Sequence, residues 1–154
     1  MTTASSPVSA GPAAGSRLRP PVAHPECAIL CVDDEKMILD ALKVQISRAL
    51  GDRYLYEFAE NADEAMELIE DLHGDGVQVL VIVSDWLMPG LRGDEFLIAV
   101  HRRFPRIVKV LLTGQADAAA IERARTQGGL HRCLHKPWNE ADLIDAIVSG
   151  LSEE

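Results

Sequence analysis

The segment Val79-Leu80-Val81-Ile82-Val83-Ser84-Asp85 joins five aliphatic residues to a hydroxyl and a carboxylate. A short, continuous apolar run of this kind is typical of a strand that is buried on both faces of a parallel sheet. Three more segments also end in charged or hydroxyl residues: Cys27-Ala28-Ile29-Leu30-Cys31-Val32-Asp33-Asp34, Val108-Lys109-Val110-Leu111-Leu112-Thr113 and His131-Arg132-Cys133-Leu134-His135-Lys136-Pro137. Open α/β sheets bind ligands just outside the carboxyl ends of their strands. The four segments therefore predict one crevice that contains Asp33, Asp34, Asp85, Thr113 and Lys136.

Amphipathic segments separate these strands. Helical spacing of apolar residues predicts helices over 38–50, with Ala49 among the inward residues, over 62–73 behind a capping box of Asn61 and Glu64, and over 94–104, preceded by Gly93 and ended by Pro105. An alanine-rich helix is expected near 116–126 and a short strand over 54–58. Asn139 is expected to cap a last helix whose inward residues are Leu143, Ile144, Ile147, Val148 and Leu151. Five strand–helix units with short connections predict a doubly wound α/β domain.

Composition and charge disfavour several classes of protein. The net charge of −9 argues against nucleic acid as a direct ligand, because phosphate backbones bind basic patches. The basic group His101, Arg102, Arg103, Arg106 and Lys109 is interpreted as a solvated helix end. No apolar run approaches the length of a membrane span. Residues 1–25 are expected to form a disordered tail without a secretory signal, before one domain over 26–154.

The three cysteines, Cys27, Cys31 and Cys133, all fall within expected strands. Their odd number and their spacing do not fit a disulfide framework. They are interpreted as reduced, buried side chains of a cytoplasmic protein.

The acids at the strand ends predict a metal ion. Clustered carboxylates repel one another unless a cation lies among them. A sparse set of carboxylate oxygens suits Mg²⁺, which keeps some of its waters. Taken singly, an aspartate or Thr113 in such a place could cap a helix and Lys136 could be a surface lysine, but their joint occurrence favours a functional site.

Four motifs in chain order carry a family resemblance. They are Val32-Asp33-Asp34-Glu35, Ser84-Asp85-Trp86-Leu87-Met88-Pro89-Gly90, Leu112-Thr113-Gly114 and His135-Lys136-Pro137. From about Cys27 to Leu151, the chain resembles the receiver domain of bacterial two-component response regulators. The resemblance implies a flavodoxin-like fold of five parallel strands in the order 2-1-3-4-5.

The resemblance also implies a phosphorylation reaction. Asp85 is the implied phosphoacceptor, which receives a phosphoryl group from a phosphohistidine of a sensor histidine kinase or phosphotransfer protein. Mg²⁺ is implied to bind Asp34 directly, Asp33 through water, Asp85, and the backbone carbonyl of Leu87. The protein is then a signalling phosphoacceptor, and it catalyses only its own phosphorylation and a slow dephosphorylation.

The remaining motif residues have implied roles around the phosphoryl group. Lys136 is implied to pair with a phosphoryl oxygen, and with Asp85 before phosphorylation. Pro137 sets the turn that aims the lysine, and Thr113 turns its hydroxyl onto the phosphoryl group, for which Gly114 leaves space. Leu87 and Gln115 flank the route of the hydrolytic water. Because Leu87 offers that water no hydrogen bond, we expect a long-lived phosphoryl group.

Two positions differ from what is usual in receivers. Cys133 stands three residues before the lysine, where many receivers have an aromatic switch residue, and Trp138 follows Lys136-Pro137 where Phe is more usual. This Lys-Pro-Trp variant resembles receivers found beside cyclic-nucleotide phosphodiesterase or kinase modules. We expect a switch that acts on an effector protein or output domain. A homodimer through the 116–126 helix, the fifth strand and the last helix is one arrangement, and no direct contact with nucleic acid or membrane is expected.

Other classes fit the sequence less well. A phosphatase of the haloacid-dehalogenase type needs a second acid where Leu87 stands. A nucleotide-binding or flavodoxin-like module needs a glycine-rich loop after the first strand, and Val32-Asp33-Asp34-Glu35-Lys36 contains no glycine. A degenerate receiver that binds a partner independently of phosphorylation is the remaining alternative, and Cys133 keeps it open.

Overall fold

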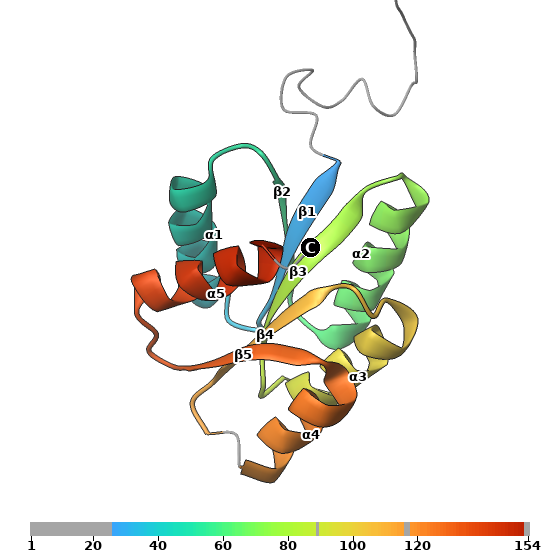
Figure 1. Ribbon diagram of the computed structural model, residues 1–154, viewed down its shortest axis with the longest axis vertical. Helices are drawn as coiled ribbons and strands as arrows, with labels where there is room; N and C mark the ends of the chain where they lie inside the picture. The colour runs from blue at the N-terminus through green and yellow to red at the C-terminus, as the bar shows by residue number, and fades with distance from the viewer. Residues whose placement is uncertain (1–25, 89, 116–117, 153–154) are drawn as a thin grey trace, which may run out of the picture.

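The computed structural model describes residues 26–88, 90–115 and 118–152, in which strands and helices alternate. The strands are β1 (Cys27–Val32), β2 (Leu55–Ala59), β3 (Gln78–Asp85), β4 (Val108–Thr113) and β5 (Leu130–His135). The helices are α1 (Lys36–Leu50), α2 (Ala62–Gly74), α3 (Gly93–Arg103), α4 (Ala118–Gly128) and α5 (Glu140–Ser152). The strands pair in parallel in the order β2-β1-β3-β4-β5, which confirms the predicted fold and strand order (Figure 1).

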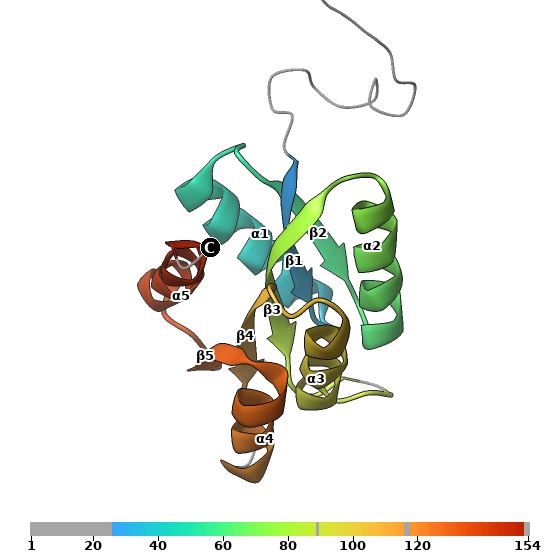
Figure 2. The ribbon, with the colours of Figure 1, turned by 45° about the vertical axis from the view of Figure 1, so that its right-hand side comes forward.

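Helices cover both faces of the sheet (Figures 1 and 2). One core lies under α1 and α5, and the other lies under α2 and α3, with α4 packed beside α3. Alternate residues of β1 enter the two cores: Ile29 and Cys31 face α1 and α5, whereas Leu30 and Val32 face α2 and α3. Burial of both faces is the reason that β1 and β3 are nearly continuous apolar runs.

Two helix starts are capped by the asparagines that the sequence singled out. Asn61 Oδ1 accepts a hydrogen bond from the backbone N–H of Glu64 at 2.8 Å, and the Glu64 side chain accepts one from the N–H of Glu60. Asn139 Oδ1 accepts from the N–H of Ala141 at 2.8 Å. These bonds satisfy N–H groups that have no partner within the helix, and they fix where α2 and α5 begin.

Strand register aligns the carboxyl ends of the sheet. Val32 of β1 lies opposite Ser84 of β3, and Asp85 lies opposite Leu112 of β4. Pairing continues past the strand ends, because the N–H of Trp86 donates to the carbonyl of Leu112 at 2.9 Å. Because Val32 pairs with Ser84, Asp33, the first residue after β1, is held beside Asp85, the last residue of β3.

Some side chains differ from the sequence prediction. Ala49 and Val148 are exposed, because each lies one residue, about 100° of helix rotation, from an inward residue. Cys27 and Cys133 are only partly buried. Lys109 is not solvated: it is 1% exposed, and its Nζ donates to the carbonyl of Ile107 at 2.5 Å.

Three expectations fall on residues outside the described part of the chain. They concern the tail over 1–25, Pro89 of the turn after β3, and the first residues, 116 and 117, of the alanine-rich helix. Among the described residues, no helix combines the length and the apolar character needed to cross a bilayer.

Candidate functional site

Three carboxylates meet at the carboxyl edge of the sheet. One oxygen from each of Asp33, Asp34 and Asp85 lies within 4.8 Å of the other two. Asp33 follows β1 and is 0% exposed, Asp85 ends β3 and is 5% exposed, and Asp34 is exposed to solvent. Hard oxygen donors that are enclosed on one side and open on the other fit a small divalent cation that keeps several waters.

Asp33 is held in a fixed orientation by two hydrogen bonds. Its Oδ1 accepts from the backbone N–H of Glu35 at 2.8 Å, and its Oδ2 accepts from Lys136 Nζ at 3.1 Å. Glu35 is the N-cap of α1, and its own side chain makes no capping hydrogen bond. Asp33 thus bonds the backbone at the start of α1 through Oδ1 and also meets Lys136 through Oδ2, so its role is not limited to the helix start.

Lys136 joins two of the acids. Its Nζ lies 2.9 Å from Asp85 Oδ1 and 3.1 Å from Asp33 Oδ2. The backbone aims this side chain, because the N–H of Lys136 donates to the carbonyl of Thr113 at 2.9 Å and continues the β4–β5 pairing. The following bond, between Lys136 and Pro137, is cis. The ammonium thus sits where it can meet either Asp85 or a group attached to it.

The electrostatics of the cluster shift the pKa of two of its members. Burial raises the pKa of Asp85 above its ordinary 3.8, and the nearby Asp33 and Asp34 carboxylates add to this, while the hydrogen bond from Lys136 opposes it. Burial alone would lower the pKa of Lys136, but its hydrogen bonds to Asp85 and Asp33 outweigh burial and raise it. The Lys136 ammonium is thus stabilised by the two acids, and ionised Asp85 is stabilised by Lys136 against the unfavourable effects of burial and of its acidic neighbours.

A hollow of about 640 Å³ opens beside Asp85. Asp34, Leu87, Gly114 and Lys136 are among the residues that line it. The Leu87 side chain is 59% exposed, and a Cβ added at Gly114 would meet no described atom within 4 Å. The hollow has room for a phosphoryl-sized group next to the Asp85 carboxylate.

Thr113 ends β4 and directly precedes Gly114 and Gln115, which line this hollow. It is 1% exposed, and its Oγ1 accepts a hydrogen bond from the backbone N–H of Gln115 at 3.0 Å. This bond ties the hydroxyl to the loop that leads to α4. A movement of the hydroxyl toward Asp85 would therefore pull on that loop.

Cys133 and Trp138 lie outside the hollow's described lining. Cys133 packs against the core under α2 and α3, and burial raises the pKa of its thiol, with Arg125 opposing. Trp138 Nε1 donates to Gln45 Oε1 of α1 at 2.8 Å, and its ring packs on the core under α1 and α5. The two residues thus support the scaffold around the site, and their role in a switch stays a prediction.

One buried group near the site was missed by the sequence analysis. Asp94, in the first turn of α3, is 0% exposed and hydrogen-bonds Trp86, the residue after Asp85. An acid in the first turn of a helix is ordinarily an exposed partner of the helix dipole. No sequence signal distinguishes it from such a residue, because its partners come from the loop after β3 and from α4.

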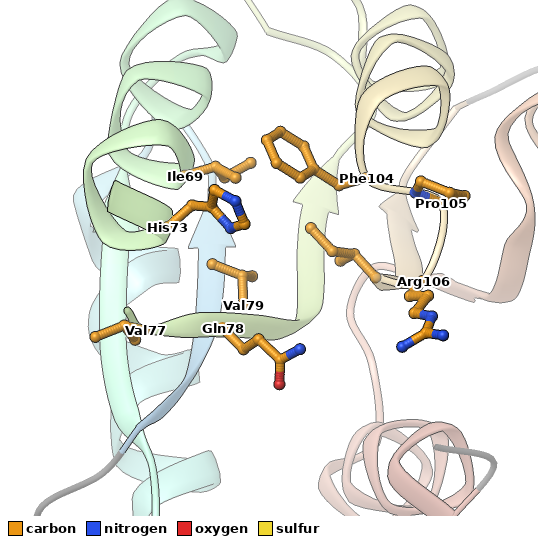
Figure 3. Close-up of a pocket in the computed structure, with 9 residues that line it drawn as sticks. Ile69, His73, Val77, Gln78, Val79, Phe104, Pro105 and Arg106 are labelled. Atoms are coloured by element: carbon orange, nitrogen blue, oxygen red, sulfur yellow. The ribbon is translucent and has the colours of Figure 1, made fainter. Parts of the chain in front are cut away.

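A second hollow, of about 260 Å³, lies at the opposite end of the sheet, where β3 begins (Figure 3). Ile69 and His73 of α2 face Phe104 across it, with Val79 of β3 between them (Figure 3). Its lining is mainly apolar and, among the described residues, contains no carboxylate. The cluster of three carboxylates thus lies at the carboxyl edge of the sheet and not at this hollow.

Comparison with known proteins gives one consistent family. The sequence model of the response regulator receiver domain matches residues 29–148. The hydrogenase transcriptional regulatory protein HoxA of Cupriavidus necator is 34% identical over 129 residues, which are 84% of this chain and 25% of that protein. The sensor kinase CckA of Brucella abortus is 34% identical over 127 residues, which are 82% of this chain and 13% of that protein. The chain thus spans about a quarter or less of the length of these two relatives.

Solved structures agree with the fold. The signal receiver domain of an HD domain-containing protein from Pseudomonas fluorescens has a TM-score of 0.73 and 29% identity, over 82% of this chain and 94% of that one. A CheY-like response regulator receiver domain from Methanospirillum hungatei has a TM-score of 0.72 and 28% identity, over 82% and 94% of the two chains.

Proposed function

Because the chain belongs to the response regulator receiver family, we propose that it accepts a phosphoryl group on Asp85 from a phosphohistidine of a sensor histidine kinase or phosphotransfer protein. The observation that carries the proposal is the position of Asp85. Its carboxylate lies 2.9 Å from Lys136 Nζ, within 4.8 Å of two other carboxylates, and beside an open hollow.

The chemistry follows from the groups present. An Asp85 oxygen attacks the phosphorus atom, the bond from phosphorus to the donor imidazole breaks, and an acyl phosphate forms. Asp33, Asp34 and Asp85, with the carbonyl of Leu87, would hold Mg²⁺, which supplies charge neutralisation for the phosphoryl oxygens. Asp33 stays in place for this because its Oδ1 accepts a hydrogen bond from the N–H of Glu35, which keeps Oδ2 on the side of Lys136.

Lys136 and Thr113 complete the surroundings of the phosphoryl group. The Lys136 ammonium, already within hydrogen-bond distance of Asp85 Oδ1, pairs with a phosphoryl oxygen as the charge arrives. The Thr113 hydroxyl donates to another oxygen, and the open space at Gly114 admits the group. Because Thr113 Oγ1 also holds the N–H of Gln115, this step displaces the loop before α4.

The lifetime of the acyl phosphate depends on water. Leu87 is exposed at the rim of the hollow and has no side-chain group that could orient a hydrolytic water. The phosphoryl group is therefore long-lived, which suits a switch more than a rapid relay. The output is a protein contact made by an effector or an output domain, through the α4–β5–α5 face or a homodimer formed there. The protein acts in the cytoplasm, as its three free cysteines favour.

Intact-mass spectrometry after incubation with acetyl phosphate tests the proposal. We expect one added phosphoryl group that requires both Mg²⁺ and Asp85, so that the label is lost with EDTA and in Asp85→Asn. Asp145→Asn is the matched control, because Asp145 is an exposed acid of α5 that pairs with Arg132 of β5 and is not among the described residues that line the hollow. A folded protein that takes no label beside a working receiver would favour the degenerate module instead.

A further inference from the structure

Asp94 is a carboxylate with two partners and no exposed surface. Its Oδ1 accepts a hydrogen bond from Trp86 Nε1 at 2.9 Å, and its Oδ2 accepts one from the Arg123 guanidinium of α4 at 2.9 Å. Burying a charge is costly unless it is paired and hydrogen-bonded, so the two partners hold Asp94 and are held by it. We call these three residues the Asp94 bridge.

The first arm of the bridge reaches the backbone that carries Asp85. Trp86 directly follows Asp85, and its carbonyl accepts a hydrogen bond from the N–H of Gly93 at 2.6 Å. The start of α3 abuts this backbone so closely that a Cβ at Gly93 would lie 2.3 Å from the Asp85 carbonyl oxygen. With its indole bonded to Asp94 as well, Trp86 is restrained through both backbone and side chain.

The second arm reaches α4. Arg123 has a side chain that is 45% exposed, yet its guanidinium pairs with a carboxylate that is 0% exposed. The α4 helix also follows the Thr113–Gln115 loop at the other side of the hollow. It is therefore joined to the site twice, once through that loop and once through the Asp94 bridge.

We infer that Asp94 is a positioning residue that sets the backbone at Asp85 and Leu87 through Trp86 and couples it to α4 through Arg123. The inference rests on the proposed function, because phosphorylation of Asp85 is the reaction that this backbone serves. A change at Asp85 that shifts Trp86 also shifts Asp94, which is bonded to the Trp86 indole, and thereby strains or breaks the bond between Asp94 and Arg123 of α4. By reciprocity, a partner whose binding displaces α4 changes the equilibrium between unphosphorylated and phosphorylated Asp85.

Two-dimensional ¹H–¹⁵N NMR of the metal-free full chain tests the coupling without phosphorylation. The chain has two tryptophans, so two indole N–H peaks are expected, and Trp138→Phe assigns them. We expect Arg123→Gln to shift the Trp86 peak and to leave the Trp138 peak, which reports the bond to Gln45, in place. Arg103→Gln is the matched control, because it removes an arginine–carboxylate pair with Glu70 at the other end of α3 and moves neither peak. An unmoved Trp86 peak in Arg123→Gln would overturn the coupling.

Labelling by acetyl phosphate at saturating Mg²⁺ tests the positioning role. We expect Asp94→Asn and Trp86→Phe to slow labelling about 10- to 100-fold, the effect of a small misplacement of a reacting group. Samples are compared below the onset of unfolding of each variant, so that lost stability does not enter the rate. A rate equal to that of the original chain, with a lower urea midpoint, would show that Asp94 is only structural. An unlabelled original chain would instead refute the proposed function, and the NMR result would still decide the link to α4.

Discussion

Replacing Gly93 by alanine should damage the protein more than any other addition of one methyl group near the site. Gly93 is the first residue of α3, and its N–H donates to the carbonyl of Trp86 at 2.6 Å. An added Cβ would lie 2.3 Å from the Asp85 carbonyl oxygen and 2.7 Å from Trp86 Cα. Both are backbone atoms, so neither can rotate away, and either the helix start or the end of β3 must move.

The expected cost follows from three contributions. Overpacking of this kind costs about 1–3 kcal/mol. Weakening of the hydrogen bond from Gly93 to Trp86 adds about 1 kcal/mol. Alanine is favoured over glycine within a helix by about 0.5–1 kcal/mol, which offsets part of this. We therefore expect Gly93→Ala to lower the free energy of unfolding by about 2 kcal/mol.

Urea denaturation, followed by far-UV circular dichroism, measures this difference. With a slope of about 1–3 kcal/mol per molar urea, the midpoint should fall by roughly 1 M. Gly114→Ala is the matched control, because the added Cβ meets no described atom within 4 Å, and its midpoint should stay where it is. If the midpoints of the two variants coincide, the close contact between α3 and the Asp85 backbone does not exist in solution.

Four further outcomes are expected. Burial and the neighbouring acids raise the pKa of Asp85 in the folded, metal-free protein. The stability that protonated Asp85 contributes is therefore present below pH 3.8 and is lost as the pH rises through the raised pKa. At pH 7, Asp85→Asn should thus raise the urea midpoint, and a lower midpoint would contradict this. For the same reason, the proton competes with the metal, so Mg²⁺ affinity measured by calorimetry should weaken as the pH falls, and a flat profile would count against the shift. Leu87→Asn should shorten the life of the phosphoryl group, and unchanged loss of label would remove the proposed role of Leu87. Trp138→Phe removes the bond to Gln45 and should cost about 1 kcal/mol of stability with no change in labelling, because Trp138 does not line the described site; slower labelling would show that it acts there.

The fold could be predicted because each local signal in the sequence agrees with the final sheet. The aliphatic runs of β1 and β3 are continuous because both faces are covered, and each run ends where the sheet ends. Asn61 and Asn139 cap the helices expected after them, since a capping bond depends only on residues two or three positions away. The strand order came from the family resemblance, because periodicity alone does not determine which strands are neighbours.

Contacts between distant elements could not be predicted. Asp94 has the sequence context of an ordinary helix start, and only the packing of α4 against α3 brings Arg123 to it. The strand around Lys109 is predicted correctly, but the basic residues that precede Lys109 suggest a solvated side chain, whereas β4 is covered on both faces and Lys109 is buried. In both cases, the charged group is buried by the packing of other elements around it, which a local sequence pattern does not contain.

The ammonium that joins Asp85 and Asp33 has a consequence for ion valence. Three carboxylates and one ammonium leave a net charge of two negative units at the site, the complement of one divalent ion. A monovalent ion would leave the site anionic, and a trivalent ion such as a lanthanide would make it cationic. This match arises only in the folded chain, because Asp33 and Lys136 are 103 residues apart in sequence. The lysine at the end of the last strand thus helps to set which class of ion the acids at the end of the first strand can use.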